Sequence, residues 1–294
     1  MTKIDCNDFQ LKRSGEKVML DIERTKIGEF LIIDKILKSF DLNDLNDPIC
    51  IQGMPGTADI GKVAIDQLVA VLKDSIEKVM EISFDDYPAG AIINDALLYA
   101  PKAEIYLWKD PERRHDIFFV TADAQPMSPR GIYGISEYIS NLMFKFGVKL
   151  IMSLGGFPVE HPDKTTKVFI SATSKEVLDP YLNFPNIEKI SKGVVLGPNG
   201  LVPTLAKMKY DIEGVVLLAQ TNGYEAMQNC DAYDLRASMA LVEILHKQFN
   251  LPFEAQFTED KIQGMETKLQ AEKESIKEEL GLTEEKVATL NYFG

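Results

Sequence analysis

Apolar residues along the chain fall into short, mostly uninterrupted runs that have the length of buried β-strands. These runs predict strands at residues 48–51, 104–108, 116–121, 149–154, 167–172 and 214–219. Between them, apolar residues recur at helical spacing in residues 60–72, 131–146 and 234–249. The alternation favours an α/β fold with a mainly parallel sheet covered on both faces. Residues 17–40 are ambiguous, because Val18 to Leu20 resemble a strand and the next segment fits either a strand or a helix.

The pattern changes after Leu251 and Pro252. Residues 259–280 consist mostly of Glu, Lys, Gln and Ala around a sparse apolar stripe at near-heptad spacing, formed by Ile262, Met265, Leu269, Ile276 and Leu280. Lys273 interrupts the stripe, and a short second helix capped by Thr283 follows. We therefore divide the chain into an α/β core domain, residues 1–250, and a helical extension, residues 251–294. The stripe must be buried on the body or on a neighbour, so we expect a homo-oligomer.

The stretch from Gly53 to Lys62, GMPGTADIGK, nearly spells a phosphate-binding loop. Such a loop needs Ser or Thr after the lysine to complete the Mg²⁺ shell, but Val63 stands there. Asp59 would also repel a polyphosphate inside the loop. We therefore interpret the stretch as a tight turn between a strand and a helix.

Charge and cysteine content narrow the classes of partner. Asp and Glu outnumber Lys and Arg by 45 to 32, and the net charge of −13 repels nucleic acid and anionic lipid. The three cysteines are too few and too far apart for a disulfide framework or a CxxC metal site. No apolar run approaches the ~18 residues that a membrane span requires, and the N-terminus is polar. We expect a cytoplasmic protein with neither a nucleic-acid nor a membrane partner.

The sequence offers no obvious catalytic centre. The three histidines lie in different predicted elements, with no second ligand at a metal-binding spacing: His115, His161 and His246. Ser153 lacks the leading glycine of a nucleophile elbow. The acidic residues at 85–86 and 110–112 stand in polar turns, where charge is usually solvated. We therefore expect no metal and no cofactor.

Three glycine-rich loops follow apolar runs that resemble strands: GMPG, GGFPVEHP and GPNG. Loops at the carboxyl ends of parallel strands are where α/β proteins bind ligands. A small-molecule cleft built from them would be lined by Gly53, Pro55, Gly56, Gly155, Gly156, Gly197 and Asn199. The alternative is that the glycines only permit close strand-to-helix turns. We give this alternative more weight, because no acid, base or nucleophile is paired with the loops.

The same loops and their neighbours, taken in order, resemble the proteasome assembly chaperone 2 family in its archaeal form. The resemblance covers roughly residues 49–249 and is carried by GMPGTADIGKVAIDQLV, by GGFP with the following KVFISAT, by GVVLGPNGLVPTLA and by GVVLLAQTNGY. It implies a three-layer α/β/α fold similar to purine nucleoside phosphorylases, without an established catalytic centre. It also implies association with the proteasome core particle. Some members have been grouped with ATP-grasp ligases, which keeps an enzymatic alternative open.

The last three residues, Tyr292, Phe293 and Gly294, resemble the tail of family members that act on the proteasome. Those tails end with a hydrophobic residue, a tyrosine and any last residue, and they enter pockets between α subunits. Here Tyr292 takes the hydrophobic position, and Phe293 replaces the tyrosine and lacks its hydroxyl. The alternative is an aromatic pair that folds back onto the body.

These observations favour a binding protein over an enzyme. The function that we expect is a homo-oligomeric chaperone or adaptor that binds the α subunits of the proteasome core particle through its C-terminal tail. One alternative is an enzyme, either an ATP-grasp-like ligase or a nucleoside phosphorylase or hydrolase, that uses the glycine-rich cleft. Another is a structural oligomer with neither partner nor ligand.

Overall fold

The computed structural model describes residues 21–163, 165–222 and 234–252, together with Gly264 and Thr267. The predicted strand at Val18, the capping residue Thr283 and the C-terminal tail lie outside the described residues. Within the described part of the chain, no helix is long and apolar enough to cross a membrane.

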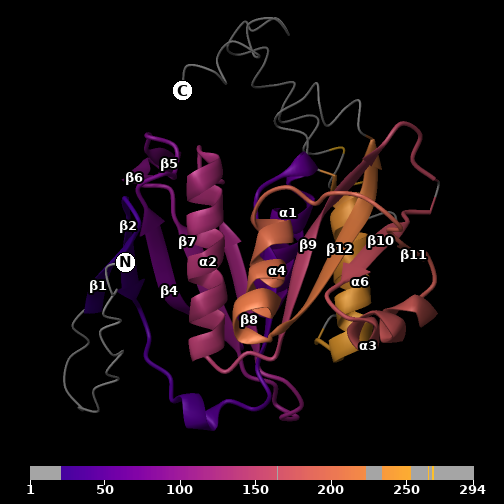
Figure 1. Cartoon of the computed structure of the whole chain (residues 1–294), viewed down its shortest axis with the longest axis horizontal. Helices are drawn as coiled ribbons and strands as arrows, with labels where there is room; N and C mark the ends of the chain where they lie inside the picture. Colours follow the sequence, from indigo (N-terminus) through magenta and orange to yellow (C-terminus); the bar gives the residue numbers. More distant parts are fainter. Residues whose placement is uncertain (1–20, 164, 223–233, 253–263, 265–266, 268–294) are drawn as a thin grey trace, which may run out of the picture.

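Ten strands form one large sheet (Figure 1). In spatial order they are β1 (Asp21–Ile27), β2 (Phe30–Ile36), β4 (Ile76–Phe84), β7 (Ala103–Trp108), β8 (Ile117–Ala122), β3 (Ile49–Gly53), β9 (Leu150–Val159), β12 (Glu213–Asn222), β10 (Val168–Ala172) and β11 (Ile187–Lys189). Two further strands, β5 (Ile92–Asn94) and β6 (Leu97–Tyr99), form a separate hairpin. All six predicted strand segments are present. Strands β9 and β12 continue to Val159 and Asn222, beyond their predicted ends, and the other ends differ by at most two residues.

The prediction of a mainly parallel sheet is wrong. Strands β8, β3, β9 and β12 run parallel at the centre, and β10 and β11 also pair in parallel. The other five pairs in this sheet are antiparallel: β1 with β2, β2 with β4, β4 with β7, β7 with β8, and β10 with β12. The connections from β4 through β7 to β8 contain no helix, and antiparallel neighbours do not need one. The result is a mixed sheet with a parallel centre.

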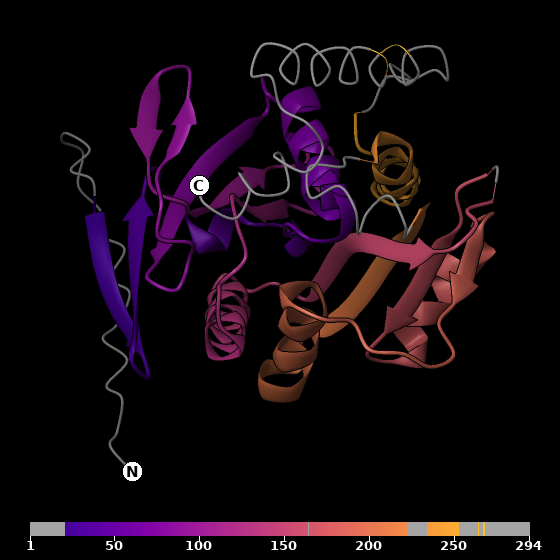
Figure 2. The same cartoon turned by 90° about the horizontal axis from the view of Figure 1, so that it is seen from above.

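Helices cover both faces of this sheet (Figure 2). One face carries α1 (Ile60–Val71) and α6 (Leu235–Phe249), and the opposite face carries α2 (Pro129–Lys145) and α4 (Pro198–Tyr210). The short α3 (Lys175–Leu178) lies near β10, and single 3₁₀ turns occupy Leu42–Asp44, Thr57–Asp59 and Asp179–Asn183. The helices predicted at 60–72, 131–146 and 234–249 are therefore confirmed as α1, α2 and α6. The expected likeness to nucleoside phosphorylases stays a prediction.

Each central strand contributes side chains to two cores. In β3, Ile49 and Ile51 join the cluster under α1 and α6, whereas Cys50 joins the cluster under α2 and α4. Phe119 and Phe118 of β8 divide in the same way. Strands buried on both faces appear in the sequence as continuous apolar runs, which explains why the sequence predicted these strands well.

Candidate functional site

The carboxyl ends of β8, β3, β9 and β12 lie at one edge of the sheet, because these four strands run parallel (Figure 1). At this edge β3 ends at Gly53 and passes through a loop into α1, and α4 begins at Pro198. Hydrogen bonds between these segments show that the first and third glycine-rich stretches meet there. Two of the segments predicted to line the cleft are therefore in contact.

A small polar network joins the three segments. The side-chain amide of Gln52 donates to Ser153 Oγ at 2.7 Å and to the carbonyl of Pro198 at 3.1 Å. Asn199 Oδ1 accepts from the backbone N–H of Met54 at 3.2 Å. Gln52, Ser153 and Asn199 are all buried. These bonds hold the loop after β3 against β9 and the first turn of α4.

Gln125 adds a fourth contact from the segment after β8. Its side-chain amide donates to the carbonyl of Pro55. A Cβ on Gly197 would lie 3.0 Å from Gln125 Oε1. The Gln125 side chain fits in this position because residue 197 has no side chain. Gly197 also has a φ of 76°, a conformation that glycine adopts without strain.

Gly53 in the near-phosphate-binding loop and Gly156 in β9 serve close packing. A Cβ on Gly53 would stand 2.0 Å from the carbonyl oxygen of Gly61, and a Cβ on Gly156 would stand 2.9 Å from that of Thr57. The backbone of Gly61, in the first turn of α1, therefore lies directly against the end of β3, and the backbone of Thr57 lies against β9. This geometry supports the interpretation of the stretch as a tight strand-to-helix turn.

Asp59 closes the loop on itself. Its Oδ1 accepts from the backbone N–H of Gly56 at 3.0 Å, which satisfies a donor that a phosphate-binding loop would offer to its ligand. Ala58 and Asp59 both have left-handed backbones, with φ of 48° and 47°. Lys62 turns along the helix to Asp66, with Nζ 3.0 Å from Oδ2. Burial opposes the charge of Lys62, but the carboxylates of Asp66, Asp123 and Asp59 raise its pKa.

Two of the predicted loops differ from expectation. Gly155 and Gly156 lie inside β9, which continues to Val159, because β12 pairs with that strand over its whole length. The apolar residues before Gly197 are not a strand, and the segment instead leads directly into α4. The segments predicted to line the cleft are therefore a continuous strand and the start of a helix as well as loops.

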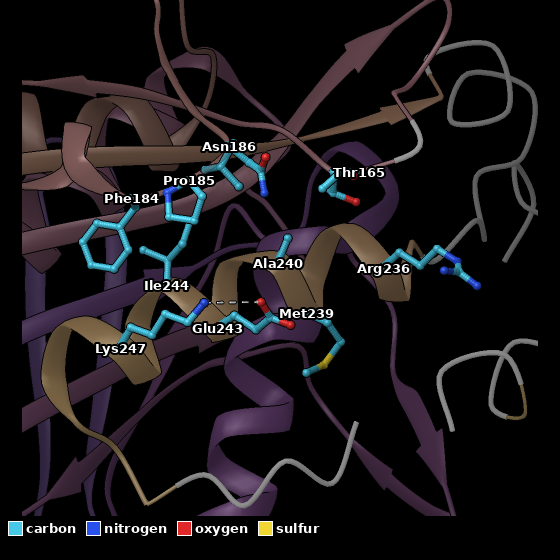
Figure 3. Close-up of a pocket in the computed structure, with 12 residues that line it drawn as sticks. Thr165, Phe184, Pro185, Asn186, Arg236, Met239, Ala240, Glu243, Ile244 and Lys247 are labelled. Carbon is cyan, nitrogen blue, oxygen red and sulfur yellow. Dashed lines mark ion pairs between the residues drawn. The ribbon is translucent and has the colours of Figure 1, made fainter. Parts of the chain in front are cut away.

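Two hollows lie outside this edge of the sheet. The first, of about 330 Å³, lies between α6 and the β10–β11 end of the sheet (Figure 3). Its lining mixes polar and apolar groups, including Arg236, Glu243 and Lys247 of α6 and the turn at Pro185. Glu243 Oε2 and Lys247 Nζ are 4.0 Å apart, a distance at which an exposed ion pair contributes little. The second hollow, of about 550 Å³, is a more apolar groove between α4 and strands β10 and β12.

Other candidate groups are buried in the core or paired with neighbouring side chains. The thiol of Cys50 is buried in the core, which raises its pKa. Asp110, expected in a solvated turn, is buried instead, and hydrogen bonds from Arg114 lower its pKa to about 2. His115 Nδ1 lies 3.0 Å from Asp47 Oδ2. Among the described residues, no three His, Cys, Asp or Glu side chains come together to hold a metal.

Comparisons with known proteins identify the family. Residues 50–276 match the model of the PAC2 family. The chain belongs to the PAC2 family. The uncharacterized protein MJ1210 of Methanocaldococcus jannaschii is 27% identical over 227 residues, which cover 77% of this chain and 83% of that protein.

Solved structures of Pyrococcus furiosus proteins share the fold. PbaB, described as an archaeal proteasome activator, superposes with a TM-score of 0.70 at 24% identity and covers 84% of this chain and 100% of its own. PbaA, described as an archaeal homolog of proteasome-assembly chaperone, gives a TM-score of 0.63 at 21% identity over 84% and 95% of the two chains. At these identities the likeness shows the shared fold.

Proposed function

We propose that the chain is a proteasome-associated chaperone or activator that binds the α subunits of the core particle. The observation that carries the proposal is membership of the PAC2 family over residues 50–276. It is supported by the fold shared with PbaB and PbaA, one described as a proteasome activator and the other as a homolog of an assembly chaperone.

The part of the chain proposed to bind is the tail, Tyr292, Phe293 and Gly294, which lies outside the described residues. Burying one aromatic side chain fully contributes roughly 2 to 3 kcal/mol. The free carboxylate of Gly294 adds a charge that a lysine in a pocket between subunits can pair with. The two aromatic rings and the carboxylate together form a specific but weak anchor.

Chain length is consistent with this arrangement. The last continuous stretch that the structure describes ends at Pro252, and 42 residues separate it from the end of the chain. Even as a helix, a segment of that length spans roughly 60 Å at ~1.5 Å per residue. The tail can therefore reach a partner while the α/β body remains outside the pocket. The division into a core, residues 1–250, and an extension, residues 251–294, belongs to the same proposal.

We further propose that the protein is cytoplasmic and that it forms a homo-oligomer. Several copies of a weak anchor bind a ring of α subunits far more tightly than one copy does. We also propose that the residues predicted to line the cleft shape the α/β body. These are Gly53, Pro55, Gly56, Gly155, Gly156, Gly197 and Asn199.

The test is a binding measurement with untagged protein and the core particle of the source organism. Removing residues 292–294 should weaken binding at least about tenfold per site, which corresponds to ~1.4 kcal/mol. The melting temperature should not change. Asn291→Ala is the matched control, since it alters a residue next to the anchor and should bind like the natural chain.

A second variant separates the carboxylate from the rings. One alanine added after Gly294 keeps both aromatic side chains but moves the carboxylate, and it should also weaken binding. If the truncated and extended chains both bind as tightly as the natural chain, the tail is not the anchor and the proposal fails.

A further inference from the structure

The hairpin of β5 and β6 presents an apolar face to solvent. The two strands lie in the connection from β4 to β7 and form a two-stranded sheet of their own (Figure 1). Ile93 and Leu98 are direct cross-strand neighbours, so they share one face, and they are 72% and 71% exposed. Ile92 and Tyr99 share the opposite face and are half-buried. An isolated two-stranded hairpin is marginally stable in water, so a segment that covers the outer face would stabilise it.

The hairpin stands on the side of the sheet that carries α1 and α6 (Figure 2). The ammonium of Lys102 lies 5.4 Å from the centre of the Tyr99 ring and 3.1 Å from Glu104 Oε1 in β7. Glu104 and Tyr106 are two residues apart in β7, so they share a face of the sheet. Tyr106 packs against the core under α1 and α6. The contacts of Lys102 therefore tie the hairpin to this side.

The chain after α6 starts on the same side and is long enough to reach the hairpin. The last continuous described stretch ends at Pro252, directly after α6. The helix predicted at residues 259–280 spans about 33 Å at ~1.5 Å per residue. Helix α6 lies over β12, and the hairpin leaves the sheet at β4, five strands away. At ~4.8 Å per strand this distance is about 24 Å, which the segment can cover.

Two described residues show which side of this segment faces solvent. Gly264 and Thr267 are helical and exposed, and a Cβ on Gly264 would meet nothing within 4 Å. Thr267 is two residues from both Met265 and Leu269 of the apolar stripe, which is about 200° around a helix with ~3.6 residues per turn. The exposed Thr267 and the stripe therefore lie on opposite sides of the helix. This arrangement is the one expected when the stripe is covered.

We propose that residues 259–280 form a helix that folds back across α1 and covers the Ile93–Leu98 face of the hairpin. The contact is made by the C-terminal half of the stripe, which contains Ile276 and Leu280. Both surfaces are apolar, and their mutual burial removes from water two surfaces that each lack another cover among the described residues.

Charge and tethering favour this occupant over a second copy. Two copies, each with a net charge of −13, repel each other. The segment after α6 belongs to the same chain, and the tether holds it near the hairpin at a high effective concentration without any encounter between two acidic chains.

The docked helix is compatible with the tail proposed as an anchor. The 14 residues that follow, 281–294, remain to carry the tail. Extended, they span about 46 Å at ~3.3 Å per residue. Since the stripe is then buried within one chain, the homo-oligomer proposed above forms through another surface.

Photo-cross-linking of the full-length protein, without the core particle, tests the contact. p-Benzoylphenylalanine in place of Ile276 should cross-link to the tryptic peptide that contains the hairpin, residues 79–102. The same group in place of Glu278 is the matched control and should not reach this peptide, because Glu278 lies about 200° around the helix from Ile276. The product should keep the mass of one chain, 33.0 kDa.

Two hairpin variants test which face is covered. Leu98→Asp places a charge in the contact and should lower the ratio of docked to undocked chains at least about tenfold, so the cross-link should be largely lost. Leu97→Asp is the matched control, because Leu97 is 70% exposed but lies on the other face of the hairpin. This variant should keep the cross-link. Both positions are exposed, so the α/β body should stay folded, as circular dichroism can verify.

The inference is overturned if the group at position 276 does not reach the hairpin or if the group at position 278 reaches it equally well. It is also overturned if Leu98→Asp keeps the cross-link or Leu97→Asp loses it. A product with the mass of two chains overturns it as well, since a second copy would then cover the hairpin. Removing residues 292–294 should leave the cross-link unchanged. Failure of the tail proposal and failure of this one are therefore separate results.

Discussion

The α-carbon of Gly61 faces the backbone of Leu154 so closely that a Cβ there would stand 2.2 Å from the Leu154 carbonyl oxygen. Gly61 is in the first turn of α1 and Leu154 is in β9, so helix and strand meet backbone to backbone. Neither backbone can give way cheaply, because both are buried in the centre of the fold.

Gly61→Ala should therefore destabilise the fold strongly. Overpacking of this kind costs about 1 to 3 kcal/mol or more in free energy of unfolding. Gly90→Ala is the control, since a Cβ at Gly90 meets nothing within 4 Å. Urea denaturation followed by circular dichroism compares the two. Equal stability of the two variants would show that the α1–β9 contact is looser than described.

The loop closed by Asp59 should not support nucleotide hydrolysis. Asp59 occupies the Gly56 donor, and Lys62 pairs with Asp66. The purified protein should show no Mg²⁺-dependent ATPase activity above background, and Lys62→Ala should change nothing. Turnover that is robust in the natural chain and lost in Lys62→Ala would overturn the binding-protein proposal.

Asp34 should make stability depend on pH. It is buried in β2 under α2, and burial raises its pKa to about 6 even though the hydroxyl of Tyr138 donates to it. An unfolded aspartate has a pKa of about 3.9. The folded state therefore binds more protons between these values, and the free energy of unfolding falls as pH rises from about 4 to about 6. Above about pH 6 the buried carboxylate is charged, and it lowers the free energy of unfolding by the full amount, roughly 3 kcal/mol.

Two variants separate the effect of the buried Asp34 charge from the effect of the hydrogen bond from Tyr138. Asp34→Asn removes the buried charge, so it should be more stable than the natural chain at pH 7.5 and lose that advantage near pH 4. Tyr138→Phe removes the donor to the carboxylate and should be less stable at pH 7.5. Thermal melts at several pH values measure both. A stability difference between Asp34→Asn and the natural chain that does not change with pH would contradict the assignment.

Asp234 should fix the start of α6. Its Oδ1 accepts from the N–H of Ala237 at 2.9 Å, and its Oδ2 accepts from Thr221 Oγ1 at 2.6 Å. Asp234→Ala loses the cap and should lower the free energy of unfolding by about 1 to 2 kcal/mol. Asp234→Asn keeps a capping oxygen and should lose much less, as urea denaturation can measure.

The parts of the fold that the sequence predicted well are those with one dominant pattern. Strands such as β8 are apolar at every position because they are buried on both faces. Strand β4, IEKVMEISF, was not predicted from the sequence, because charged residues interrupt its apolar run. This strand lies in the antiparallel part of the sheet. Helix α4 was also missed, since Pro198, Gly200 and Pro203 hide its helical pattern. The parallel sheet was inferred from alternation alone, which says nothing about strands joined without helices.

The sequence predicted that the glycine-rich segments meet, but not which side chains join them. Glycines marked the positions where backbones approach, and Gly53 and Gly156 lie where they do. The side chains that join the segments, Gln52 and Gln125, have no signature in the sequence. Gln52 is 101 residues from Ser153, and only the folded sheet brings the two together. The roles of the cleft residues and of the tail stay predictions.

The division of each central strand between two cores has a consequence for how the molecule opens. A fluctuation that pulls β3 or β8 out of the sheet must expose apolar surface on both faces at once, so their amide protons should exchange with solvent only when the whole body unfolds. The β1–β2 ribbon is different, since Ile32 is its only fully buried apolar side chain among the described residues. Separating the ribbon from β4 exposes less apolar surface than opening the parallel centre, so the amides of the ribbon should exchange sooner than those of the parallel centre.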